Sequence, residues 1–186
     1  MSTHLRRFGA LFIVAATILV MLRAAPALAA SATEIDAEVD AALQTLYATN
    51  SEAKSLAGSA KAVLVFPDVV KAGFIGGLQF GEGALRRGGR TVGYYNTTAA
   101  SYGLQAGVQK FSYALFFMTD SALDYLKGSG GWEIGTGPSV VIVDSGMAKA
   151  LTSTTLHKDV YAMFFDQTGL FAGLGLQGTK ITQINP

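Results

Sequence analysis

From Gly73 onward, apolar side chains alternate with small or polar ones at a spacing of two, and helical spacing disappears. This alternation is typical of β-strands that bury one face. One such face carries Phe74, Gly76, Leu78 and Phe80. Gly88 and Gly89 then supply a hairpin turn that leads into a second strand, Thr91–Tyr95. This part of the chain is therefore predicted to form an antiparallel sheet.

Later segments repeat the same alternation with aromatic and β-branched residues. The predicted strand faces are Phe111, Tyr113, Leu115 and Phe117; Val140 and Ile142 opposite Val141 and Val143; and Val160, Ala162 and Phe164 opposite Tyr161, Met163 and Phe165. Glycines inside such strands favour sharp curvature or close backbone contact. The expected fold class is α+β: a curved antiparallel β-sheet, half-barrel or sandwich-like, packed with N-terminal amphipathic helices and short inter-strand helices.

The predicted helices begin at Thr33, which is placed to act as an N-cap. Apolar residues at spacings of three and four predict an amphipathic helix over 33–48, and a second helix is predicted over Ser51–Ser59. A buried strand, Ala62–Phe66, is expected to end at Pro67. Short helices between strands are predicted over Ser121–Lys127 and Gly146–Leu151.

The first 30 residues have the pattern of an export signal. Arg6 and Arg7 precede an apolar run of 15 residues, Phe8–Leu22, which is shorter than the roughly 20 residues that a spanning helix needs. A small-residue segment with an Ala-x-Ala pattern follows at 24–30. We expect residues 1–30 to be a signal peptide and residues 31–186 to form one domain; an uncleaved anchor is the alternative.

Composition narrows the classes of function for this domain. Once the signal peptide is removed, 11 basic residues face 13 acidic ones, a net charge of −2, which argues against a general nucleic-acid binder. The chain has no cysteine, so packing must hold the fold without disulfides.

Several motifs suggest chemistry that the surrounding sequence does not support. Gly173–Gly178 matches G-x-G-x-x-G, but a dinucleotide site needs a following helix and an acidic residue that the last eight residues lack, so we read a glycine-rich strand there. Catalysis by a triad or by a His-ligated metal needs histidine, and the mature chain contains one, His157, which offers a metal at most one imidazole ligand. We therefore expect no catalytic residue, no bound metal and no cofactor; a pair of carboxylates that meets in space is the alternative.

Basic residues around the predicted hairpin are the best candidates for a binding site. Arg86 and Arg87 precede the glycine turn and Arg90 follows it, while Lys61 and Lys71 lie nearby in the sequence. Guanidinium and ammonium groups suit phosphate, so these five residues are the candidate lipid-binding set. The alternative is that charged turns only keep the hairpin in water.

Blocks of sequence across the domain resemble the SYLF family of lipid-binding domains, also called the yeast-type actin-binding domain, from about Ile35 to Ile184. They are Ala60–Pro67, Lys71–Phe74, Gly81–Gly83, Gly93–Asn96, Gly103–Gly107, Tyr113–Phe117, Gly135–Ser139, Asp159–Tyr161 and Gly173–Ile181. The resemblance implies a domain that binds anionic phospholipid, with a membrane role for its N-terminal amphipathic helix. Some relatives also bind actin filaments.

Together, the signal peptide and the resemblance lead to one expectation. The protein is expected to be exported, periplasmic or secreted, and to associate peripherally with anionic phospholipid at a membrane surface. The alternative is a structural or protein-interaction module of the cell envelope with an envelope protein as partner. The sequence predicts no oligomeric state.

Overall fold

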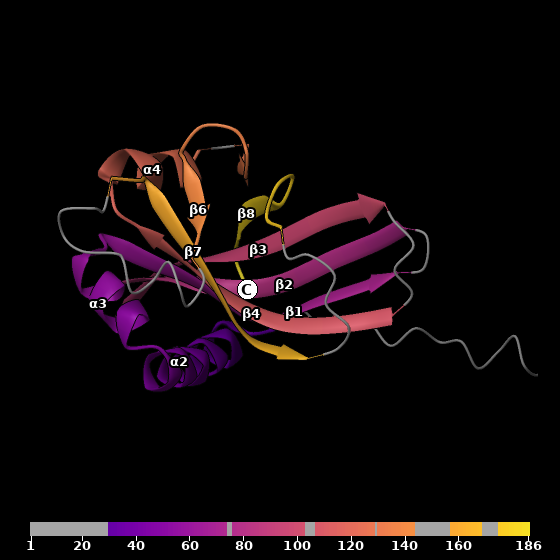
Figure 1. Cartoon of the computed structure of the whole chain (residues 1–186), viewed down its shortest axis with the longest axis horizontal. Coiled ribbons are helices and arrows are strands. Elements are labelled where there is room, and N and C mark those ends of the chain that lie inside the picture. Colours follow the sequence, from indigo (N-terminus) through magenta and orange to yellow (C-terminus); the bar gives the residue numbers. More distant parts are fainter. Residues whose placement is uncertain (1–29, 74–75, 103–106, 129, 144–156, 169–174) are drawn as a thin grey trace, which may run out of the picture.

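The computed structural model describes residues 30–73, 76–102, 107–128, 130–143, 157–168 and 175–186. Within these ranges, three helices pack with one strongly curled sheet that forms a half-barrel (Figure 1), which confirms the predicted α+β class. No helix in the described ranges combines the length and the hydrophobicity of a membrane-spanning segment.

Two consecutive helices, α2 (Ala32–Thr49) and α3 (Ser51–Ser59), open the fold close to their predicted ranges. The predicted N-cap, Thr33, is wrong, because Ser31 caps the helix. The Ser31 hydroxyl accepts from the Glu34 amide at 3.4 Å, and the Glu34 carboxylate accepts from the Ser31 amide at 2.8 Å. This reciprocal capping box satisfies two backbone donors, the amides of Ser31 and Glu34. Thr33 lies two residues after Ser31, within the helix, and takes no part in the capping box.

Eight strands form one sheet in the order β5-β8-β3-β2-β1-β4-β7-β6. Their bounds are β1 Ala62–Gly73, β2 Gly76–Arg87, β3 Arg90–Tyr102, β4 Gly107–Phe117, β5 Trp132–Glu133, β6 Val140–Ile142, β7 Val160–Thr168 and β8 Lys180–Ile184. Neighbouring strands are antiparallel except β6 and β7, which are parallel. The prediction of a wholly antiparallel sheet is wrong at this edge, because the long connection 143–159 allows a parallel return.

β1 does not end at Pro67 as predicted. It continues to Gly73 because its register against β4 shifts between Phe66 and Val69. Proline has no N–H to donate to the ladder, and such a bulge is one of the few places where a strand accepts it. The Ser112 hydroxyl on β4 donates to the Pro67 carbonyl, which satisfies an acceptor that the bulge removes from the ladder.

Two hydrophobic clusters cover opposite faces of the central strands over the part of the sheet away from Leu78 and Val108. The first face carries an aromatic core that includes the predicted row Phe111, Tyr113, Leu115 and Phe117, together with Val160, Ala162, Trp132 and residues of α4 (Asp120–Leu126). The second face carries Val65, Ala114, Phe116, Tyr161, Met163 and Phe165 and packs against α2 and α3 through Ile35, Val39, Leu46, Ala53 and Leu56. The predicted faces of residues 111–117 and 160–165 are thereby confirmed, whereas Leu78 and Phe80 are exposed and Phe74 lies outside the described residues. The sheet is a central layer with α2 and α3 covering one side (Figure 1).

Predictions for the later segments have mixed outcomes. The helix predicted over Ser121–Lys127 is confirmed as α4. The glycine-rich strand predicted at Gly173–Gly178 is wrong over its described part, because residues 175–179 form a turn and β8 begins only at Lys180. Gly178 has φ +74°, a left-handed conformation that breaks a strand. The helix predicted over Gly146–Leu151 lies outside the described residues.

Candidate functional site

Four of the five candidate lipid-binding residues gather at the β2–β3 hairpin. Arg87 and Arg90 are cross-strand partners across the turn, Arg86 precedes them on β2, and Lys61 lines the same cavity as the two turn glycines. The turn needs glycine, since Gly88 and Gly89 have φ of +57° and +78°. Lys71 is elsewhere, because it pairs with Gln79 and Gln109 toward the opposite end of the sheet. The structure therefore assembles part of the predicted site and separates Lys71 from it.

Arg86 is turned inward toward α2. Its Nη2 lies 2.7 Å from the Asp40 carboxylate and 3.5 Å from that of Asp36, and it donates to the Asp36 carbonyl at 3.0 Å. Only 12% of the Arg86 side chain is exposed. Its Nε is buried and has no hydrogen-bond partner within the described part of the chain. Arg86 therefore holds the helix and does not face solvent as the hairpin hypothesis assumed.

Asp36 extends this contact to β3. Its carboxylate accepts hydrogen bonds from the Thr91 hydroxyl at 2.6 Å and from the Tyr94 hydroxyl at 3.0 Å. Burial, and then the hydrogen bond to the Asp36 anion, raise the pKa of Tyr94. We call Asp36, Asp40, Arg86, Thr91 and Tyr94 the helix clamp. It fixes α2 on the sheet through charge-assisted hydrogen bonds.

The remaining hairpin cations face solvent. Arg87 and Lys61 are 56% and 49% exposed, and each approaches one carboxylate, Asp120, at 4.0 and 3.7 Å. Arg90 is exposed at the turn. Lys61 and Arg87 thus share one acidic neighbour, Asp120 at the start of α4, and Arg90 lies beside them at the turn. We call Lys61, Arg87 and Arg90 the hairpin cations.

A cavity of about 280 Å³ lies beside the hairpin. It is lined by apolar residues of α2 and α3, by the start of β1 and by the hairpin turn: Leu43, Tyr47, Ala57, Ala60, Ala62, Val63, Gly88 and Gly89, together with Asp40, Lys61 and Arg86. Its lining places apolar side chains directly next to a cation. Such a combination suits an amphipathic ligand.

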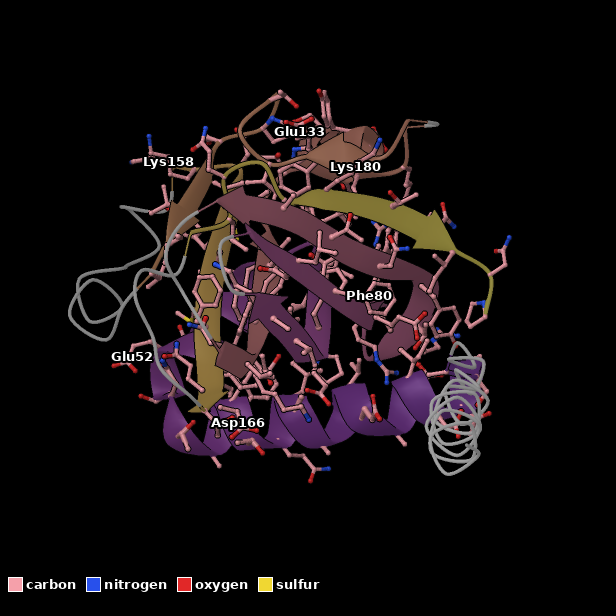
Figure 2. The ribbon with its side chains drawn as sticks, turned by 90° about the vertical axis from the view of Figure 1, so that its right-hand side faces the viewer. Glu52, Phe80, Glu133, Lys158, Asp166 and Lys180 are labelled. Carbon is pink, nitrogen blue, oxygen red and sulfur yellow. The ribbon has the colours of Figure 1, made fainter. Side chains whose placement is uncertain are left out.

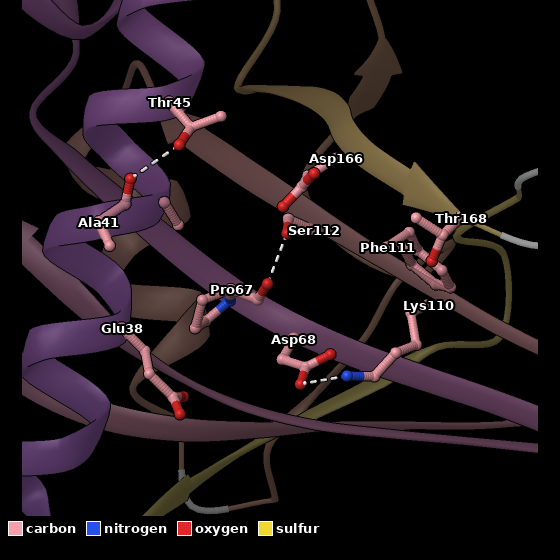
Figure 3. A pocket seen from close by; sticks show the side chains of 11 residues that line it. Glu38, Ala41, Thr45, Pro67, Asp68, Lys110, Phe111, Ser112, Asp166 and Thr168 are labelled. Atoms are coloured by element: carbon pink, nitrogen blue, oxygen red, sulfur yellow. Dashed lines mark hydrogen bonds and ion pairs between the residues drawn. The ribbon is translucent and has the colours of Figure 1, made fainter.

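A larger cavity, of about 420 Å³, lies between α2 and the bulge of β1 (Figure 3). Three carboxylates line it, from Glu38, Asp68 and Asp166, against one cation, Lys110. Lys110 Nζ lies 2.9 Å from Asp68, and this hydrogen-bonded pair raises the pKa of Lys110. The excess of negative charge disfavours an anionic headgroup in this cavity.

Within the described part of the chain, no three His, Cys, Asp or Glu side chains are grouped so that they could hold a metal ion. Sequence reasoning missed the role of Asp36 and Asp40. The contact spans 46 residues between Asp40 and Arg86, so no local pattern could reveal it. The apolar side of α2 is buried against the sheet.

Comparison with protein families gives a match over the C-terminal half of the chain. Residues 98–185 match the family model Ysc84, described as "Las17-binding protein actin regulator". No curated protein matches the chain. The matched range begins within β3 and extends through β8, and it contains the sequence blocks from Gly103 onward that resemble SYLF domains. The chain therefore carries, over these residues, a domain of the Ysc84 family, the SYLF family that its sequence predicted.

Proposed function

We propose that residues 31–186, released from a signal peptide at residues 1–30, form a lipid-binding protein that acts outside the cytoplasm. In this proposal it is periplasmic or secreted and associates peripherally with anionic phospholipid at a membrane surface. The family match supports binding of lipid or of actin-related proteins in general. The export pattern at the N-terminus supports the extracytoplasmic location.

The observation that carries this proposal is the set of hairpin cations. Lys61, Arg87 and Arg90 lie at or beside the hairpin turn, Lys61 and Arg87 both approach Asp120, and an apolar-lined cavity lies beside them. Each Lys or Arg near an anionic surface contributes about 1 kcal/mol. Three such cations favour weak, reversible association. Arg86 is removed from the binding set because it belongs to the helix clamp.

We further propose that the protein has no catalytic activity. The support is the sequence: one histidine in the mature chain, no cysteine, and no nucleophile motif. Binding of a phospholipid headgroup by cations needs no metal and no cofactor.

Vesicle sedimentation tests the proposal. The chain is incubated with vesicles of equal parts phosphatidylglycerol and phosphatidylcholine at low salt, and the triple variant Lys61→Gln, Arg87→Gln, Arg90→Gln is compared with Lys54→Gln, Lys127→Gln, Lys158→Gln, which removes equal charge elsewhere. We expect the hairpin variant to bind about tenfold or more weakly than the control variant. Equal binding by the two variants removes the hairpin from the mechanism, and absence of binding by the unmodified chain rejects the proposed function.

A second candidate is a structural or protein-interaction module of the cell envelope. The family description, which names a Las17-binding protein and actin regulator, favours it. A protein contact made by apolar surface is less sensitive to salt than headgroup binding. Salt-insensitive association with a purified envelope protein, without binding to anionic vesicles, selects this candidate.

A further inference from the structure

An exposed apolar surface lies at the end of the sheet away from the β2–β3 hairpin. Its most exposed side chains are Leu78 and Val108, at 73% and 63%. Ala72 on β1 pairs with both of them, and Leu78 also pairs with Ala100 on β3. Residues directly opposite each other in antiparallel strands point to the same face. One apolar row therefore crosses four neighbouring strands.

A second row runs parallel to the first, two residues along each strand. Phe80, which is 51% exposed, pairs with Val70 on β1 and with Thr98 on β3. Figure 2 looks along the sheet from this end and shows Phe80 between α2 and β8. We call the combined surface the apolar end face; it consists of Val70, Ala72, Leu78, Phe80, Ala100 and Val108. A contiguous apolar patch of this kind marks an interaction site, whereas scattered apolar residues do not.

Two lysines lie at the rim of the apolar end face. Lys110 pairs with Val70 at one end of the second row, and Lys180 pairs with Thr98 at the other end. Lys180 is exposed, and Lys110 keeps its bond to Asp68. The two rows contain no acidic residue. An apolar centre with the exposed Lys180 at its edge is complementary to a bilayer with anionic headgroups.

The N-terminal segment joins the body beside this face. The Ala30 amide donates to the Glu82 carboxylate at 3.1 Å, and Glu82 follows Phe80 by two residues on β2, which is about 7 Å along the strand. Seven residues, 23–29, separate Ala30 from the apolar run that ends at Leu22, and seven extended residues span at most about 25 Å. A bilayer that takes up the apolar run during export thus lies within reach of the apolar end face.

We propose that the apolar end face is a membrane-docking surface, in which Leu78, Phe80 and Val108 enter the interfacial region of a bilayer while Lys180 lies among the headgroups. This inference rests on the proposed lipid-binding function and names the part of the molecule that reaches the acyl chains. Arg87 lies nine residues from Leu78 on the same strand, about 30 Å away. The apolar end face and the hairpin cations are therefore separate contacts, the first insensitive to salt and the second sensitive to it.

The test compares matched substitutions of exposed apolar residues. The full chain is expressed with its own N-terminal segment, purified after host processing, and its N-terminus is read from the intact mass. Leu78→Gln with Val108→Gln removes the centre of the face. Val92→Gln is the control, because Val92 is 53% exposed on β3 next to the hairpin. In high salt, we expect the double variant to bind phosphatidylglycerol–phosphatidylcholine vesicles about tenfold or more weakly than the unmodified chain, and the control to bind equally well.

A second measurement does not depend on a loss of binding. Because the chain has no cysteine, Leu78→Cys and Val92→Cys can each carry one environment-sensitive fluorophore. We expect the emission of the label at position 78 to shift to the blue when vesicles are added in high salt, which screens the hairpin cations, and that of the label at position 92 to stay unchanged.

Three results overturn the inference. If the double variant and the unmodified chain bind vesicles equally in high salt, lipid binding stands but does not use this face. If neither binds vesicles at any salt concentration, both the proposed function and the inference fail. The third result is that something other than a bilayer occupies the face. If the unmodified chain is a dimer that Leu78→Gln with Val108→Gln converts to a monomer, a second copy occupies it. If the label at position 78 is already shielded in an unprocessed chain, the chain's own apolar run occupies it.

Discussion

Nη2 of Arg86 on β2 lies 2.7 Å from Oδ1 of Asp40 on α2, and the same nitrogen donates to the Asp36 carbonyl of the next turn of the helix. These contacts cross from the hairpin to the helix that covers the second face of the sheet. Because Arg86 is committed to the helix, it binds a phosphate headgroup only if α2 leaves the sheet. The helix clamp therefore makes docking of α2 and exposure of this guanidinium mutually exclusive.

Removal of the Arg86 guanidinium should destabilise the fold. We expect Arg86→Gln to lower the free energy of unfolding by about 1–2 kcal/mol, because it leaves two aspartates without their cation. Arg87→Gln, an exposed arginine one residue away, should cost less than about 0.5 kcal/mol. Urea denaturation measures both. A cycle with Asp40→Asn isolates the pair, and equal losses for Arg86→Gln and Arg87→Gln contradict the helix clamp.

Two glycines give opposite expectations for the same substitution. A Cβ added to Gly83 on β2 would lie 2.0 Å from the Val65 carbonyl oxygen of the neighbouring strand, so Gly83→Ala forces two backbones apart. We expect a loss of about 3 kcal/mol or more. Gly58 in α3 has open space around its Cβ position, and Gly58→Ala should stabilise the fold by about 0.5–1 kcal/mol. Thermal unfolding of the two variants checks both signs, and a neutral Gly83→Ala refutes the close β1–β2 approach.

A buried hydroxyl pair joins β4 to β3. The Tyr113 hydroxyl donates to Thr97 Oγ1 at 2.6 Å, and both residues are fully buried. Tyr113→Phe leaves a buried acceptor unpaired, and we expect it to cost about 1–2 kcal/mol in urea denaturation. Tyr113→Phe combined with Thr97→Val removes both polar groups, so its cost should be clearly less than the sum of the two single costs. If the cost of the double variant equals the sum of the two single costs, the hydrogen bond is contradicted.

Asp159 should make the free energy of unfolding depend on pH in the acid range. The Ser139 amide and then the Ser139 hydroxyl donate to its carboxylate, at 2.9 and 2.8 Å, and they lower the pKa of Asp159 below its usual value of 3.8. The folded protein therefore holds this group ionised where the unfolded chain would protonate it. Its contribution is fully present above about pH 4 and is lost as the pH falls through the lowered folded pKa.

Carboxyl NMR titration measures the pKa of Asp159 directly, and urea denaturation at neutral and acid pH measures the linked stability. Ser139→Ala removes the hydroxyl donor and keeps the amide, so the pKa should rise part of the way toward 3.8. A pKa that does not move in Ser139→Ala contradicts the contribution of the hydroxyl.

Local patterns predicted the elements of this fold, and long-range contacts decided the rest. Alternation in residues 111–117 and the Gly88–Gly89 turn depend on neighbours in sequence, and both predictions are confirmed. The parallel partner of β6 and the continuation of β1 through Pro67 depend on strands far away in sequence, so alternation could not reveal them. A strand pattern assigns Leu78 and Phe80 to one face, but it does not say whether anything covers that face.

The candidate site follows the same division. The glycine turn places Arg87 and Arg90 together, as the sequence predicted. The inward orientation of Arg86 depends on Asp36 and Asp40, which approach it only when α2 docks. Position along the chain suggested that Lys71 lies near the hairpin, but twelve-residue strands carry it to the far end of the sheet.

The strand order has a consequence for biogenesis. The middle of the sheet, β3-β2-β1-β4, comes from residues 62–117, whereas the strands that flank it, β8 and β7, come from residues 160–184. Until those later residues arrive, both outer ladders of the early four-stranded unit present unpaired amides and carbonyls, which invite aggregation. Such a chain, rich in distant pairings, folds slowly. In the export proposed above, slow folding would leave the chain unfolded during its passage across a membrane, with both ladders unpaired until residues 160–184 arrive.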